Sequence, residues 1–306
     1  MPAIDSLQRQ ITTAKELQSV VKTMKVLAAA SIRQYERAVE SLAEYNRTIE
    51  MGLQIVLGYA GSEGHNFVEI EPAINNRLAA VILGSDQGMC GQFNEQITHY
   101  AINQIEQLPI ASANRKIVTV GARVIPPLEN AKVAIASSFN MPSSLAGITP
   151  MVQELLLQIE AWRQTQQINR IILFYNQPRS NTSYSPHTLH LLPLDRTWLS
   201  NLQQQPWNSR TLPIFTMERS RLFSELIGQY FFISLYRAFA ESLASENASR
   251  LAAMQVAEQN IEERLAEFNA QFQQLRQATI TEEILEIVAG SEALAQSGEI
   301  SMGHGA

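Results

Sequence analysis

"VVKTMKVLAAASIRQYERA", residues 20–38, lies within a run from residue 3 to residue 57 that contains no proline and only one glycine, Gly52. Two sets of residues, each recurring every seven positions, follow this run. The first set is Leu7, Ala14, Val21, Ala28, Tyr35, Leu42, Ile49 and Val56, and the second is Ile4, Ile11, Gln18, Lys25, Ile32, Val39, Asn46 and Leu53. The first set is wholly apolar or aromatic, and the pattern predicts a coiled-coil helix over residues 1–57. Such a helix would be roughly 80 Å long, which exceeds a compact domain.

The C-terminal third repeats this pattern. From Glu218 to Ala289 there is no proline, and Gly228 is the only glycine. Apolar residues recur at Leu226, Ile233, Ala240, Met254, Ile261, Phe268 and Leu275. We therefore expect a second coiled-coil helix over 215–290 that pairs antiparallel with the first, followed by an extended tail over 291–306. The polar seam residues Gln18 and Lys25 are of the kind that fixes the register of a coiled coil.

The region between the two helices, 77–194, is typical of an α/β domain. Short apolar runs bounded by turn residues predict strands at 77–84, 116–121, 131–136 and 170–176, with a possible edge strand at 187–194. Helical spacing predicts helices at 92–108 and 144–164. This alternation favours a small, mostly parallel sheet. Residues 58–76 and 195–214 have the composition of linkers.

One turn in this domain, "GSDQGMCGQFN" (84–94), resembles a ligand-binding loop at first sight. Its glycines, Gly84, Gly88 and Gly91, do not have the spacing of a dinucleotide fingerprint, and it lacks the lysine of a phosphate loop. A strand–turn–helix context suits anion binding at a helix N-terminus, but the favoured interpretation is a tight structural turn.

Cys90, the only cysteine, lies in this turn. It could be a nucleophile activated by the N-terminus of the next helix, although His99 lies too far along that helix to be its base. The favoured interpretation is a small buried thiol. His187 and His190 would point to opposite faces of a strand, which is poor geometry for one metal. We therefore predict no cofactor, no metal and no catalytic site in this chain.

The composition of the chain further limits the class of protein to which it can belong. A net charge of −6 argues against a general nucleic-acid binder, and one cysteine fits a reducing compartment. No apolar run approaches the roughly 20 residues that a bilayer span needs, and "MPAIDSLQRQ" has no apolar signal core. These features predict a cytosolic protein or one that is peripheral on the cytosolic face of a membrane.

Four stretches resemble the gamma subunit of F-type ATP synthases. They are "VVKTMKVLAAASIRQYERA" (20–38), "SDQGMCGQFN" (85–94), "LASENASRLAAMQVAEQN" (243–260) and "LRQATITEEILEIVAGSEAL" (275–294). They occur in the family's order and extend over most of the chain. The resemblance implies an α/β fold plus a long coiled coil, in which a Rossmann-like domain is inserted between antiparallel N- and C-terminal helices.

The resemblance also implies a function. Gamma is the central rotor stalk that couples ion flow through a membrane ring to ATP synthesis or hydrolysis in the beta subunits. The implied partners are the alpha and beta subunits, the epsilon subunit and the c-ring, and the implied location is the cytoplasmic face of a bacterial inner membrane or a thylakoid membrane.

Individual residues take roles from the resemblance. Arg276 and Gln277 match a pair that meets beta, and Arg250, Glu246 and Thr281 match a polar cluster between the helices and beta. Lys25 and Val26 fall where the N-terminal helix faces beta. Gly84, Asp86, Gly88, Cys90 and Gly91 match a structural turn.

Three departures from the family pattern, at Gln87, Gln92 and Ser31, suggest a divergent gamma subunit from a second ATPase of its host. The competing hypotheses are a coiled-coil adaptor and a thiol enzyme that uses Cys90.

Overall fold

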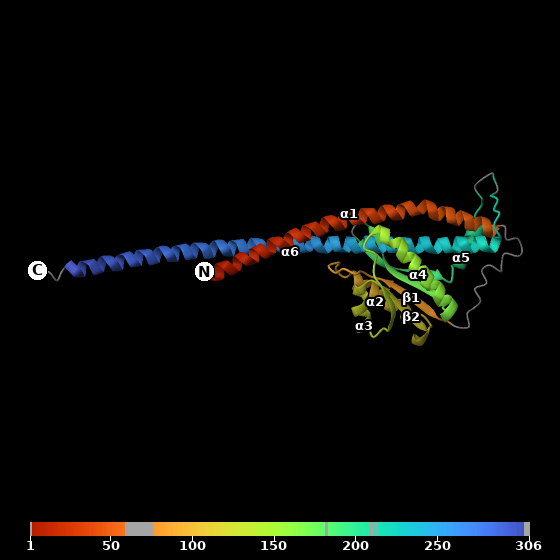
Figure 1. The fold of residues 1–306 in the computed structure, drawn as a ribbon, viewed down its shortest axis with the longest axis horizontal. Helices are drawn as coiled ribbons and strands as arrows, with labels where there is room; N and C mark the ends of the chain where they lie inside the picture. Colours follow the sequence, from red (N-terminus) through yellow and green to blue (C-terminus); the bar gives the residue numbers. More distant parts are fainter. Residues whose placement is uncertain (1, 59–75, 181–182, 208–210, 212, 303–306) are drawn as a thin grey trace. The chain divides into compact units, whose positions relative to one another are not determined.

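The computed structural model describes residues 2–58, 76–180, 183–207, 211 and 213–302. The chain folds into two compact units. Unit 1 comprises Met1–Lys25 and Met254–Ala306, and unit 2 comprises Val26–Ala253. Figure 1 shows the elements, which are α1 (Pro2–Gly58), β1 (Leu78–Leu83), α2 (Phe93–Glu106), β2 (Arg115–Val120), α3 (Ile125–Asn130), β3 (Ile135–Phe139), α4 (Leu145–Gln166), β4 (Arg170–Ser180), β5 (Ser183–Leu192), α5 (Arg196–Gln204) and α6 (Arg219–Met302), with short 3₁₀ turns at Ser112–Asn114 and Ala122–Val124.

Unit 2 is built on a five-stranded sheet with the strand order β3-β2-β1-β4-β5. The first four strands are parallel, and β5 pairs antiparallel with β4 at one edge. β1 at the centre is fully buried, because α2 and α3 pack on one face of the sheet while α4 and α6 pack on the other. This is the mostly parallel sheet that the alternating pattern predicts, and it agrees with the Rossmann-like domain that the family resemblance implies.

One stretch of α6 in unit 2, residues 238–250, is buried on almost every side. Between residues 238 and 250 only Asn247 is even partly exposed. This segment, "AFAESLASENASR", is rich in alanine and serine, and small side chains allow a helix backbone to approach its neighbours closely. Leu235, Phe239 and Leu243 join the core of the sheet, together with Tyr35 of α1. Both long helices are therefore part of the α/β unit along this stretch.

In unit 1 the two helices pack antiparallel through an apolar seam. Leu7 and Ile11 of α1 form a cluster with Leu265 of α6, to which Ala14, Ile261, Phe268 and Phe272 add their side chains. None of the sixteen α1 positions in the two predicted heptad sets is classed as exposed, which confirms the seam. On α6 the seam stops one turn earlier than predicted, because Leu275 is 39% exposed.

The third strand is displaced from its prediction. The run 131–136 was expected to be a buried strand, but β3 begins only at Ile135. The residues before it close the end of α3, where Lys132 adopts a left-handed conformation with φ 57° and the Val133 amide donates to the Leu128 carbonyl at 3.0 Å. β3 is also an edge strand, so its side chains are only half buried at best.

Two further boundaries differ from the prediction. The linker assigned to 195–214 contains α5, whose first turn is capped by the Asp195 carboxylate accepting from the Thr197 amide at 2.8 Å. Leu199 and Leu202 of α5 are buried in a cluster with α1 and α6. The segment predicted as an extended tail is helical as far as Met302. The predicted linker 58–76 lies almost wholly outside the described residues.

The predicted domain division also differs from the observed units. It placed 1–57 and 215–290 outside the α/β domain 77–194, whereas unit 2 includes both helices from Val26 onward and up to Ala253. The reason is the burial of α6 against the sheet, which heptad spacing does not reveal.

We predict that Gly121→Ala destabilises the fold. Gly121 has φ +101°, and a Cβ there would lie 2.8 Å from the Ser85 amide nitrogen, so backbone would have to move. The free energy of unfolding in urea should fall by about 2–4 kcal/mol. The matched control is Gly228→Ala, because Gly228 is inside α6 with nothing within 4 Å of a built Cβ. That change should leave stability unchanged or raise it by up to about 1 kcal/mol. Equal effects of the two changes would contradict this account.

Candidate functional site

The turn 84–94 is held by the ends of three strands. The Gly84 amide donates to the Val120 carbonyl at 2.8 Å. The Asp86 carboxylate accepts from the amides of Ala122 and Met141, each at 2.8 Å. Asp86 thus ties the chain after β1 to the segments after β2 and β3, and both of its oxygens are used inside the fold.

Cys90 is packed inside this turn. Its side chain is 2% exposed and lies against Ser85 and Asn94, with the Asn94 Nδ2 donating to its Sγ at 3.5 Å. Burial raises the pKa of the Cys90 thiol above its usual range, so the unreactive thiol form is favoured at neutral pH. This environment supports the structural interpretation and argues against a nucleophile.

The turn lies where open α/β sheets bind ligands. That place is the crevice at the carboxyl ends of neighbouring strands whose connections leave in opposite directions, here β1 and β4. In this chain the crevice is filled by protein. Asn176 of β4 donates to the Phe93 carbonyl at 3.1 Å, and the Phe93 ring packs edge-on against Tyr184 with ring centroids 5.6 Å apart. The Tyr184 hydroxyl lies 3.3 Å from the Ser249 hydroxyl of α6.

We call the contact between the turn and α6 the turn–helix clamp, formed by Gln87, Cys90, Gly91, Ser249 and Arg250. The Ser249 hydroxyl donates to the Cys90 carbonyl at 2.5 Å, and the Arg250 Nη2 lies 3.5 Å from the Gln87 carbonyl. Gly91 has φ +57°, and a Cβ there would touch the Ser249 hydroxyl at 3.4 Å. The sequence-predicted turn therefore packs directly against α6, and Gly91 supplies the left-handed conformation at that point.

A buried ion pair flanks the clamp. The Arg250 Nη2 and the Glu246 Oε1 are 2.5 Å apart, and both side chains are 8% exposed. Burial raises the pKa of Glu246, and the charge and hydrogen bond of Arg250 offset part of that rise. The structure thus brings together two of the three residues assigned to one polar cluster. The third, Thr281, belongs to unit 1, where its hydroxyl donates to the Gln277 carbonyl at 2.9 Å.

The remaining predicted contact residues are on the helix surfaces. Arg276 and Gln277 are exposed on α6. Val26 of α1 is 69% exposed. Lys25 is instead half-buried, with its amine paired to the Glu258 carboxylate of α6. Gly88 lies beside the Arg123 guanidinium, whose Nη2 would be 3.5 Å from a Cβ built on it.

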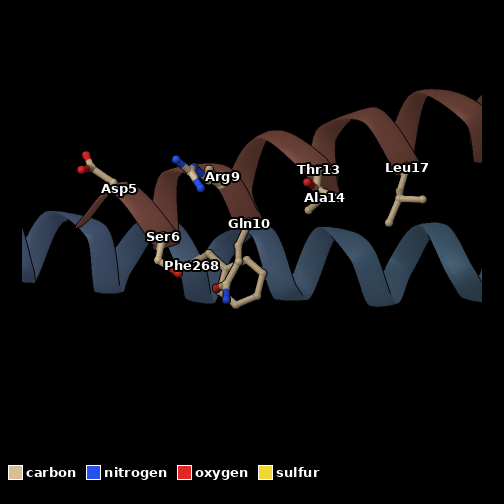
Figure 2. A pocket seen from close by; sticks show the side chains of 8 residues that line it. All are labelled: Asp5, Ser6, Arg9, Gln10, Thr13, Ala14, Leu17 and Phe268. Atoms are coloured by element: carbon tan, nitrogen blue, oxygen red, sulfur yellow. The ribbon is translucent and has the colours of Figure 1, made fainter. Parts of the chain in front are cut away.

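Large apolar side chains surround Arg276 and Gln277 on the same stretch of α6. Leu275, Ile280, Ile284, Leu285, Ile287 and Val288 are between 39% and 71% exposed. A groove opens nearby between the two helices of unit 1, as Figure 2 shows; apart from Phe268, its lining residues belong to α1 and include the half-exposed Leu17. Exposed apolar surface of this kind marks an interface with other chains.

Sequence reasoning missed a second junction, centred on Glu241. This buried carboxylate accepts from the Tyr175 hydroxyl at 2.9 Å, the Gln177 amide at 3.1 Å and the Arg237 Nε at 2.7 Å. It joins α6 to the β4–β5 hairpin. The only sequence signal was an Arg237–Glu241 pair at helical i,i+4 spacing inside an apolar stretch.

The described residues contain no cluster of three or more His, Cys, Asp and Glu side chains able to hold a metal ion. Within the same residues, no helix is both long enough and apolar enough to cross a membrane.

The family model described as ATP synthase matches residues 3–294, so the chain belongs to this family. The similar relatives are named ATP synthase gamma chain. One from Buchnera aphidicola subsp. Diuraphis noxia is 24% identical over 294 residues, covering 96% of this chain and 99% of the relative. One from Geobacter metallireducens is 25% identical over 296 residues, covering 96% and 99%.

Solved structures share the fold. The rotor of the Euglena gracilis mitochondrial ATP synthase matches with a TM-score of 0.61 at 16% identity, covering 91% of this chain and 99% of that one. The central stalk and c-ring structure from Tetrahymena thermophila matches with a TM-score of 0.54 at 20% identity, covering 78% and 99%. These matches confirm the predicted combination of an α/β domain with long N- and C-terminal helices.

We predict that Glu246 makes stability fall as pH rises. Burial raises the pKa of its carboxyl above the ordinary value in the folded state, so the folded state binds more protons, and stability is lost as pH rises from the unfolded-state pKa through the folded-state pKa. Glu246→Gln should remove this component. The stability of the wild type relative to the variant, from urea unfolding at pH 4 to 7, should therefore decrease with pH. Glu263→Gln, at an exposed site on α6, is the control. An increase with pH would show that the ion pair with Arg250 outweighs burial.

Proposed function

We propose that this chain is the central-stalk gamma subunit of a rotary F-type ATP synthase. It couples ion flow through a membrane ring to ATP synthesis or hydrolysis at the beta subunits. Family membership and the shared fold support this proposal, and the observation that carries it is the exposed apolar stretch of α6 from Leu275 to Val288. Six large apolar side chains on one stretch of helix are costly in water, and a sleeve of surrounding subunits would bury them.

The mechanism is steric coupling. An asymmetric helix pair inside a ring of alternating alpha and beta subunits contacts three chemically equivalent beta subunits differently. Its orientation then acts as an effector that favours a different conformation in each beta. The exposed Arg276, Gln277 and Val26 are the proposed contacts with beta. Thr281 lies on the same stretch of α6 as Arg276 and Gln277. Lys25 pairs α1 with α6, and Glu246 and Arg250 hold α6 against the turn 84–94.

The chain needs no catalytic site or cofactor of its own in this role. Support comes from the crevice between β1 and β4, which Phe93, Tyr184 and Ser249 fill with protein, and from the buried, protonated thiol of Cys90. The α/β domain is proposed to meet the epsilon subunit and the c-ring, and the complex to lie on the cytoplasmic face of a bacterial inner or thylakoid membrane.

The direct test is reconstitution with the alpha and beta subunits of the same organism. The complex should contain one copy of this chain, and its ATP hydrolysis should be at least several-fold faster than that of alpha and beta alone. Failure to form a complex, or hydrolysis that is independent of this chain, would overturn the proposal.

We predict that Arg276→Ala weakens coupling without weakening the fold. Arg276 is exposed, so the melting temperature of the isolated chain should stay within about 1 °C. In the reconstituted complex, loss of a charged contact with beta should lower ATP hydrolysis by about 5- to 50-fold. Arg264→Ala is the matched control, because Arg264 is an exposed arginine of α6 that pairs only with Glu267 at the surface. Equal effects of the two changes on hydrolysis would rule out a specific contact at Arg276.

A further inference from the structure

Two polar pairs, each joining one residue of α1 to one of α6, interrupt the apolar seam of unit 1; we call each of them a rung. The Lys25 amine pairs with the Glu258 carboxylate, and the Gln18 Nε2 donates to the Glu262 Oε1 at 3.1 Å. The Lys25 and Glu258 side chains are only 29% and 16% exposed. Lys22 is a more distant neighbour of this pair, with its Nζ 4.0 Å from the Glu258 Oε1.

The apolar part of the seam does not by itself select one alignment of the helices. Leu7, Ile11 and Ala14 of α1 face Ile261, Leu265 and Phe268 of α6. A slip of one heptad would replace Ile261 by Met254 or Phe268, and Phe268 by Ile261 or Leu275, which are all apolar. Leu265 would be replaced by Phe272 in one slip and by Glu258 in the other. The apolar contacts therefore discriminate poorly against the first of these slips.

The Lys25 rung does distinguish between registers. A slip of seven residues along α6 would place Lys25 opposite Leu251 or Leu265 in place of Glu258. Either leucine would leave a partly buried ammonium without its carboxylate, which is costly. The Gln18 rung is more tolerant, because the same slips would bring it opposite Gln255 or Asn269, both polar.

We propose that the Lys25–Glu258 ion pair is the register lock of the two helices in unit 1, and that Lys25 is a positioning residue for the surface that they present. A partly exposed ion pair adds little to stability, so the role of this pair is to exclude the slipped registers. One heptad is about 10 Å along a helix. A slip would displace the α1 surface of unit 1 from Arg276 of α6 by that amount. The lock itself does not depend on the rotor assignment.

The test measures register by disulfide cross-linking of the full-length chain. The pair Gln18→Cys with Glu262→Cys reports the native register, and Gln18→Cys with Gln255→Cys or with Asn269→Cys reports the two slips. Cys90 can stay, because it is buried. Each cysteine pair is oxidised in four backgrounds. These are the chain with Lys25 present, the single changes Lys25→Met and Lys25→Glu, and the charge swap that combines Lys25→Glu with Glu258→Lys. Lys15→Met, at an exposed position, is the control.

With Lys25 present, the native pair should cross-link at least tenfold more than either slipped pair. Lys25→Met and Lys25→Glu should lower this ratio at least fivefold, the charge swap should restore it, and Lys15→Met should not change it. A ratio within twofold of the original after both Lys25 changes would overturn the lock. If a Lys25 variant with a shifted cross-linking ratio hydrolyses ATP at the original rate in the reconstituted complex, the register lock is not important for rotation. If the chain fails to assemble with alpha and beta subunits, the result counts against the rotor assignment alone.

Discussion

The structure of unit 2 depends on how closely the turn 84–94 approaches α6. The Ser249 hydroxyl donates to the Cys90 carbonyl at 2.5 Å, with Gly91 directly beside it. Ser249 supplies the hydroxyl that reaches the turn, and Gly91 adopts the left-handed φ of +57° that the turn has beside it. The contact also closes the crevice in which related sheets hold a ligand. In this chain the edge of the sheet where related domains bind a ligand holds the helix α6.

The second junction has different chemistry and the same consequence. The Glu241 carboxylate accepts hydrogen bonds from the Tyr175 hydroxyl, the Gln177 amide and the Arg237 guanidinium, and these bonds fix the β4–β5 hairpin to α6. The two junctions lie two turns apart on one helix, so α6 is held at separate points against bending and twisting relative to the sheet. A subunit that transmits rotation needs such an attachment, because α6 could otherwise turn relative to the sheet without moving it.

Much of this fold follows from the sequence, and the reasons for the rest are physical. The α1 seam, β1, β2 and β4 were predictable because their apolar residues recur at fixed periods. β3 was misplaced because an edge strand is only half buried and the end of α3 uses the residues before it. α5 was missed because the Asp195 cap is a single residue within a polar segment. The contacts of Ser249 with Cys90 and of Glu241 with Tyr175 could not be predicted, since each joins residues more than 60 positions apart in the chain.

The sheet of unit 2 should turn together with the part of α6 that it holds when ATP is hydrolysed. The most direct measurement attaches a probe to unit 2 through Leu157→Cys on α4, where the side chain is 74% exposed, in a complex whose alpha and beta subunits are fixed to a surface. On addition of ATP, the account predicts stepwise rotation of the probe in one direction, at a rate proportional to hydrolysis. ATP hydrolysis by the same complex with a stationary or randomly moving probe would contradict it.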